Sequence, residues 1–262
     1  MLPCPMVSGR ACVFCGNRPV TLEHVFPRWL AEYLGQRDTV TIVGDSLAQT
    51  PYRRYASLSY SSQVKRVCAS CNNGWMADLE DAASSVWKRI FTEQVALSLS
   101  DSRLLLARWA MKTALMIQFL HRESAVPGSV YKDFYNASRP APNTLIYVAR
   151  RTMERMPSGA HSLNSRLEYR SQGKDQPQDL GELYAVTYFI QNVVLQVIGF
   201  RLTVKSMPHL DFPQTFQPFV QRVWPPYADL RWPPDNPTMT EQQALQFGVE
   251  LKAISPGSIL NR

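Results

Sequence analysis

The sequence predicts an α+β protein in which a small cysteine-stapled module is followed by a larger mixed domain. Three observations support this prediction. Two C-x2-C pairs enclose residues 16–67, helical periodicity follows the second pair, and β-branched and aromatic runs dominate from residue 143 onward. We therefore divide the chain into a module over residues 1–92 and an α+β domain, with a helical hairpin and an antiparallel sheet, over residues 93–262.

The composition is that of a folded protein. The chain has 262 residues, of which 45% are hydrophobic, enough for one large domain or two smaller ones. Residues 1–11 contain no apolar stretch of the kind found in secretory signals. The two most apolar runs, 103–123 and 183–204, are interrupted by polar residues; in the first, Arg108 and Lys112 lie four positions apart, which predicts an amphipathic helix. We expect a cytoplasmic protein that does not enter a membrane.

The charge of the chain favours a polyanionic partner. The formal net charge is +7, and the basic excess falls in the first two thirds of the sequence. Many basic proteins never bind nucleic acid, so the charge alone excludes little. Four basic residues between the cysteine pairs are candidate phosphate contacts, with solvated surface positions as the alternative. They are Arg53, Arg54, Lys65 and Arg66.

Short elements are expected around the cysteine pairs and longer ones after them. Before the second pair we predict a helix over 27–34 and strands over 39–43 and 64–67. After it we predict helical structure from residue 72, a helix over 82–97, and a second long helix ending near residue 123. Later strands are expected over 145–148, 167–170, 184–191 and 193–204, the last two forming a hairpin that turns at Gln191-Asn192. The proline- and aromatic-rich segment 208–237 is predicted to be extended and packed, with a proline-rich ligand strip for another domain as the alternative.

The cysteine spacing is typical of a metal site. Cys12, Cys15, Cys68 and Cys71 form two C-x2-C pairs, and Cys4 stands apart. In a reducing compartment such pairs favour metal over disulfide, and four thiolates can surround one Zn²⁺ tetrahedrally. The alternative is that these cysteines are small buried apolar residues. A four-cysteine zinc site has no open position, so we expect a structural role.

The candidate chemistry lies between the two cysteine pairs. Glu23 and His24 are neighbours in the segment 21–27. A carboxylate can bind a divalent cation that polarises a phosphate, and a neutral imidazole can accept the proton of an attacking water. Neighbours in an extended strand point to opposite faces, so the two side chains share one site only at a strand end or a bulge.

Taken together, these segments resemble the HNH (ββα-metal) endonuclease family over about residues 12–80. The motifs that carry the resemblance are Cys12-Val13-Phe14-Cys15, Glu23-His24-Val25-Phe26-Pro27 and Cys68-Ala69-Ser70-Cys71-Asn72-Asn73. They are similar to a bacterial subgroup known only as HNH endonuclease-like. The resemblance implies a zinc-stapled, treble-clef-like ββα-metal module with His24 as the general base. It also implies that Glu23 and Asn72 bind a catalytic Mg²⁺ or another divalent cation, with Asn73 able to substitute for Asn72.

The chain departs from the family pattern at two places. Gln63 stands nearest to the position of an asparagine that orients the base histidine, and residues 74–76 replace a basic residue after the second cysteine pair. The function we expect is divalent-metal-dependent hydrolysis of phosphodiester bonds, with DNA as the expected substrate. The alternatives are a catalytically inactive, zinc-stabilised nucleic-acid-binding protein and a protein-binding adaptor. Residues 93–262 would then select the substrate, a protein partner or a second copy of the chain.

Overall fold

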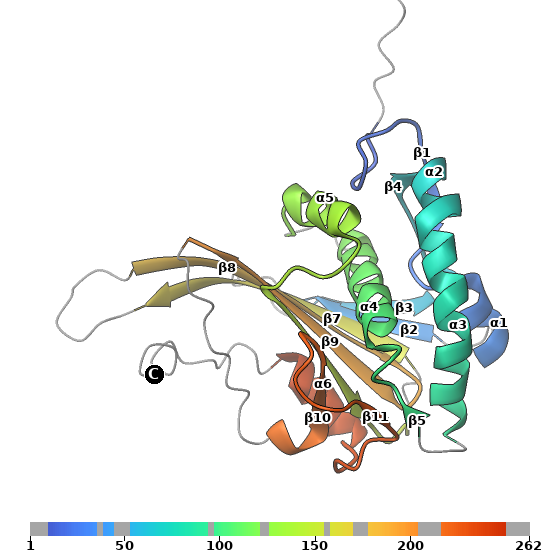
Figure 1. The fold of residues 1–262 in the computed structure, drawn as a ribbon, viewed down its shortest axis with the longest axis vertical. Coiled ribbons are helices and arrows are strands. Elements are labelled where there is room, and N and C mark those ends of the chain that lie inside the picture. Colours follow the sequence, from blue (N-terminus) through green and yellow to red (C-terminus); the bar gives the residue numbers. More distant parts are fainter. Residues whose placement is uncertain are drawn as a thin grey trace, which may run out of the picture.

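A seven-stranded sheet forms the centre of the molecule and has helices on both faces (Figure 1). The computed structural model describes residues 10–35, 39–44, 53–93, 97–120, 126–154, 158–169, 178–203 and 216–249. One face carries helices α1 (Arg28–Leu34), α3 (Ala77–Thr92), α4 (Arg103–Ile117) and α5 (Gly128–Ala137), and the other carries α6 (Glu241–Val249). The predicted α+β class is thereby confirmed.

The order of the strands brings distant parts of the sequence together. From one edge to the other the strands are β10 (Val220–Trp224), β6 (Thr144–Arg150), β9 (Val193–Leu202), β8 (Gln178–Ile190), β7 (Ser158–Tyr169), β2 (Thr39–Gly44) and β3 (Arg53–Ser59). Neighbouring strands are antiparallel except β2 and β7, which are parallel. β8 and β9 form the predicted hairpin, and Gln191 at its turn has a φ of 53°.

Two smaller sheets flank the large one. β1 (Val20–His24) pairs with β4 (Gln63–Cys68), and β5 (Leu97–Ser98) pairs with β11 (Arg231–Trp232). The remaining short helices are α2 (Ala69–Cys71), η1 (Asn72–Met76), η2 (Gln118–Leu120) and η3 (Gln217–Phe219). The described part of the proline-rich segment therefore contains two short strands and a helical turn instead of one extended run. Its residues 208–215 lie outside the described part.

Alternating side chains give the large sheet two hydrophobic faces. On β9, Val193, Leu195 and Val197 belong to a core beneath helices α3 and α4, whereas Val194 and Ile198 belong to a second core beneath α6. The first core extends from Cys12 to Trp232 and so contains residues from both sides of the predicted boundary at residue 92. The N-terminal segment that carries the cysteine pairs and the large sheet are thus joined through side-chain packing.

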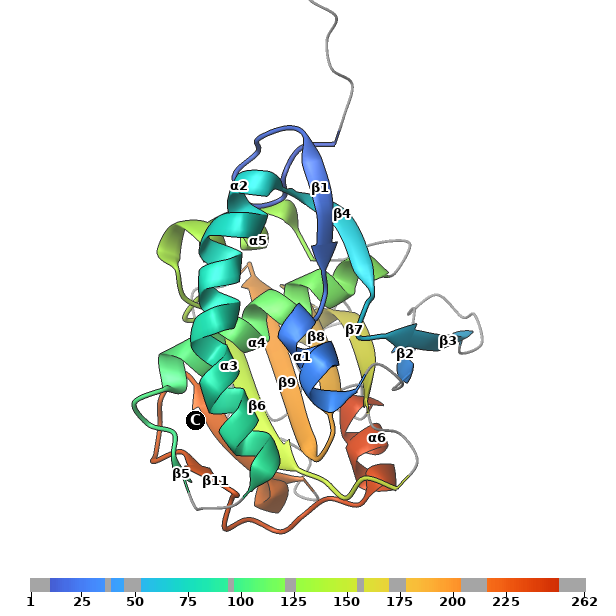
Figure 2. The ribbon, with the colours of Figure 1, turned by 90° about the vertical axis from the view of Figure 1, so that its right-hand side faces the viewer.

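Helix α4 differs from the amphipathic helix that its sequence predicts. It is buried almost all round, and Lys112 is fully buried. One side of α4 covers the sheet while the other packs against α3, where the rings of Trp87 and Trp109 have centroids 4.7 Å apart. α3 and α4 cross each other in Figure 2. Among the residues that the structure describes, no helix is both long enough and apolar enough to span a bilayer.

Helix α1 matches the predicted helix over 27–34, α3 ends earlier than predicted, and α5 and α6 were not predicted. Pro27 immediately precedes α1, where its missing N–H is no loss to the helix. α3 ends at Thr92 and not at residue 97, because Glu93 adopts a left-handed conformation with a φ of 47°. A non-glycine residue in this region ends a right-handed helix.

Candidate functional site

The four paired cysteines lie together at one end of the antiparallel strand pair formed by β1 and β4. The sulfur atoms of Cys12, Cys15, Cys68 and Cys71 all lie within 4.8 Å of one another, and those of Cys15 and Cys68 are 3.4 Å apart. Zinc–sulfur bonds of about 2.3 Å in a tetrahedron require similar sulfur spacings. The predicted metal-binding group is therefore present, and its geometry fits zinc.

Burial and local hydrogen bonds act on these thiols in opposite directions, and burial keeps the pKa of Cys15 raised although the N–H of Asn17 lowers it. The backbone N–H groups of Asn17 and Cys71 donate to the sulfurs of Cys15 and Cys68, respectively. Burial opposes ionisation of Cys68, but the bond from Cys71 and those from neighbouring cysteines lower its pKa to about 7. Burial raises the pKa of Cys71 well above its ordinary value. Four thiolates this close need a divalent cation to balance their charge, so zinc would act as a structural clamp.

The four cysteines, here called the clamp, lie where strands β1 and β4 pair and where the helix that follows β4 begins. β1 and β4 are antiparallel, with an irregular register between Thr21 and Glu23, and β4 leads into Cys68 and then into α2, η1 and α3. The N–H of Val13 in the first cysteine loop donates to the carbonyl oxygen of Arg66 on β4. Figure 2 shows β1 and β4 side by side, with α2 leading into α3. The order of these elements is therefore strand β1, strand β4 and then helix α3.

His24 ends β1 and is half-buried. Its partner across the hairpin is Gln63, whose Nε2 lies 2.9 Å from His24 Nε2. Burial lowers the pKa of His24, and the positive charges of Arg28 and Lys112 lower it further, against the opposing effect of Glu80. The imidazole is therefore mainly neutral at pH 7, the form in which it accepts a proton.

Glu23 points into the protein interior. It is 4% exposed, and its Oε1 lies 3.1 Å from Nζ of Lys112, which comes from α4. The same ammonium lies 2.5 Å from Oε1 of Glu80 on α3. Burial raises the pKa of the Glu23 carboxyl, and the charge of Lys112 acts in the opposite direction. Lys112 keeps its charge because Glu80 and Glu23 together raise its pKa against the effect of burial.

Asn72 has a structural set of partners. Its Nδ2 donates to the hydroxyl of Thr21 at 3.3 Å and to the carbonyl oxygen of Leu22 at 3.0 Å, which ties the helix start to β1. Asn73 is exposed. The side chains of Glu23, His24 and Asn72 thus contact different partners. The predicted site residues are close along the hairpin, but in this arrangement they do not form one ligand set for a divalent ion.

The candidate phosphate contacts divide into three cases. Lys65 is exposed on β4. Arg66 is half-buried, and its guanidinium lies 5.0 Å from the centre of the Phe119 ring. Part of the guanidinium therefore contacts this ring instead of solvent. The side chains of Arg53 and Arg54 lie outside the described part of the structure.

Sequence reasoning missed Lys112 and Glu80. Lys112 is the one lysine in the apolar run 103–123, and we assigned it to a solvent-facing side of a helix. Its charge inside a nearly continuous apolar run was the signal, because a buried lysine requires carboxylate partners. Glu80 carried no comparable signal, since acidic residues near a helix start are common.

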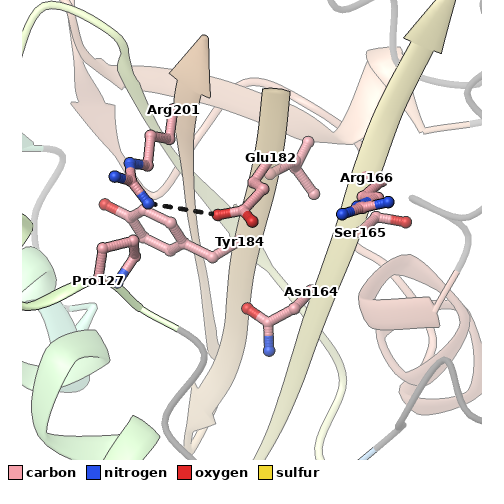
Figure 3. Close-up of a pocket in the computed structure, with 8 residues that line it drawn as sticks. Pro127, Asn164, Ser165, Arg166, Glu182, Tyr184 and Arg201 are labelled. Atoms are coloured by element: carbon pink, nitrogen blue, oxygen red, sulfur yellow. Dashed lines mark ion pairs between the residues drawn. The ribbon is translucent and has the colours of Figure 1, made fainter. Parts of the chain in front are cut away.

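One pocket lies on the large sheet, away from the cysteines. A pocket of about 200 Å³ is formed by β7, β8, β9 and Pro127 (Figure 3). On its lining, Arg201 and Glu182 form an ion pair at 3.8 Å, and both side chains are more than half exposed. The pairing partly neutralises the arginine, and screening by water leaves little attraction for a small anion.

Comparison of the chain with models of protein families, with curated proteins and with solved structures gave no match.

Proposed function

We propose that the chain is an HNH-type endonuclease that hydrolyses phosphodiester bonds in DNA, with His24 as the general base. The observation that carries this proposal is the placement of His24. It ends the first strand of a clamped strand–strand–helix unit, remains partly accessible and has a lowered pKa. The resemblance of the motifs to the HNH family adds weight to this reading of the geometry.

Gln63 would set the direction of proton transfer. In the structure the amide nitrogen of Gln63 faces Nε2 of His24. With the amide turned by 180°, its oxygen accepts the proton on Nε2 and leaves Nδ1 with a free lone pair. Nδ1 then accepts the proton of a water molecule that attacks phosphorus. The leaving oxygen takes a proton from solvent as its bond to phosphorus breaks.

The expected catalytic divalent ion does not fit the residues as they are arranged. Lys112 holds Glu23, and the amide of Asn72 donates to Thr21 and to the backbone of Leu22. We therefore assign no step to that ion. Zinc, which fits the four cysteines, would hold the hairpin to the helix and take no part in proton transfer.

The test is nicking of supercoiled plasmid by zinc-loaded protein, in metal-depleted buffer and with added Mg²⁺. We expect His24→Ala to reduce the nicking rate by at least about 100-fold, the usual contribution of a general base. Leu22→Ala is the matched control, because Leu22 is a 58% exposed neighbour on the same strand. Nicking that survives unchanged in His24→Ala would refute the proposed role.

A second candidate is a zinc-stabilised nucleic-acid-binding protein without catalysis. It is favoured because Glu23 pairs with Lys112 and Asn72 bonds to the backbone of Leu22, so neither holds a catalytic metal ion in this arrangement. Duplex binding without nicking in any metal would support it, with a salt dependence that decreases in Lys65→Ala. A chain that neither cuts nor binds DNA at low salt would instead be assigned to the adaptor class.

A further inference from the structure

The ammonium of Lys112 is surrounded by three oxygen atoms. Oε1 of Glu80 lies at 2.5 Å, Oε1 of Glu23 at 3.1 Å and the carbonyl oxygen of His24 at 3.4 Å. An ammonium group has three N–H donors, so each donor has an acceptor. The lysine side chain has no exposed surface, and those of Glu23 and Glu80 are 5% and 17% exposed.

The charges of this cluster are unequal. Two carboxylates face one ammonium, so the ionised cluster carries one net negative charge. A buried lysine is tolerated when carboxylates accept its hydrogen bonds, and the removal of either partner leaves an uncompensated charge. The cluster joins three elements that are distant in the sequence, because Lys112 comes from α4, Glu23 from β1 and Glu80 from α3.

The oxygen atoms around the ammonium are those that a hard divalent cation prefers. Carboxylates and backbone carbonyls are the usual ligands of Mg²⁺, Mn²⁺ and Ca²⁺. We propose that Lys112 is the resident cation of this site and occupies the position in which Glu23, Glu80 and the carbonyl of His24 would otherwise hold a divalent ion. This assignment explains why Glu23 is not free to act as a metal ligand.

The assignment has a consequence for the proposed nuclease, and this consequence alone rests on the proposed function. Lys112 contacts the backbone of His24, so it positions the end of β1 and keeps a fixed positive charge behind the base. It is a positioning residue, because its ammonium is fully buried and does not reach the surface.

The test is Mn²⁺ binding to zinc-loaded full-length protein, with free Mn²⁺ measured by electron paramagnetic resonance. We expect Lys112→Met to gain one Mn²⁺ site at least about tenfold tighter than any that the wild type shows at this position, since repulsion from the ammonium is removed. The gain should vanish in Lys112→Met/Glu23→Gln. Lys88→Met, which removes an exposed lysine from α3, is the control and should gain no site.

Thermal unfolding keeps the test decisive if Lys112→Met folds poorly. Added Mn²⁺ should raise the Tm of Lys112→Met, or restore its folding, and leave the Tm of the wild type unchanged. A folded Lys112→Met that gains no Mn²⁺ site, or one that stays unfolded at millimolar Mn²⁺, would overturn the assignment. Neither readout depends on DNA cleavage, so a failure here is distinct from a failure of the proposed nuclease.

Discussion

At the scale of single residues, the groups around His24 determine the pKa of its imidazole. Arg28 follows four positions later at the start of α1, and Lys112 lies behind its backbone. Burial is the largest factor that disfavours the imidazolium form and so lowers the pKa of His24; both charges act in the same direction, and Glu80 acts against them. The neutral form therefore persists to lower pH than in an unperturbed histidine.

Removal of the positive charge at Arg28 should raise the pKa of His24. Burial remains the largest cause of the lowered pKa, so we expect Arg28→Ala to restore only part of the shift. The acidic limb of any His24-dependent activity should then move to higher pH, because the neutral base forms later as pH rises. The measurement is an NMR titration of the imidazole C2 proton, with the exposed Arg139→Ala as control. A pKa that stays the same or falls in Arg28→Ala would contradict this.

The same shift has a consequence for stability. The pKa of His24 is lower in the folded chain than in the unfolded chain, so the unfolded chain binds the proton more readily. The contribution of His24 to stability is therefore complete above the unfolded pKa of about 6.5 and decreases as the pH falls below that value.

At this scale the sequence predicted the four cysteines of the metal-binding group. The two C-x2-C pairs converge as expected. Gln63, which was given as a departure from the family pattern, is the partner of His24. Lys112 was assigned to the wrong environment, because a lysine on a helix is usually solvated and its two carboxylate partners lie on distant elements. The hydrogen bonds of Asn72 depend on where the helix start meets β1, which spacing alone does not determine.

At the scale of elements, the cysteine clamp is the link between β4, the first cysteine loop and α3. Cys71→Ser should remove one ligand from the site, and we expect the bound zinc to fall well below one equivalent per chain. The Tm should fall by roughly 10 °C, given that ~1 kcal/mol corresponds to roughly 2–4 °C in a chain of this size. Elemental analysis and thermal unfolding measure the two effects. Cys4→Ser is the control, and an equal effect of both substitutions would argue against the clamp.

Element type was predictable where one physical signal dominated. β-branched and aromatic residues are frequent along β6, β8 and β9, and strands formed there as expected. β8 begins six residues and β7 nine residues earlier than the predicted strands. Helix α4 was misjudged because both of its sides are covered, a tertiary effect that periodicity reports only weakly. The parallel pairing of β2 with β7 could not be predicted, since it joins segments more than one hundred residues apart.

At the scale of the whole molecule, the module over residues 1–92 depends on the rest of the chain. Its β2 needs β7, its Trp87 packs on Trp109, and its Glu23 needs Lys112. A zinc-saturated fragment of residues 1–92 would expose apolar surface and leave a buried carboxylate unpaired. We expect this fragment to unfold without a cooperative transition in circular dichroism and to give a poorly dispersed amide NMR spectrum. A sharp transition with good dispersion would show that the predicted boundary marks an autonomous unit.

The parallel pairing of β2 with β7 also constrains how the chain matures. Both cysteine pairs leave the ribosome well before residues 158–169, so the metal clamp can close around the β2–β3 hairpin while its sheet partner is still unsynthesised. Until β7 arrives, β2 presents an open edge of backbone donors and acceptors, which is the kind of surface on which chains self-associate. We therefore expect self-association of the nascent chain to be greatest after β2 and β3 have been made and before β7 has been made.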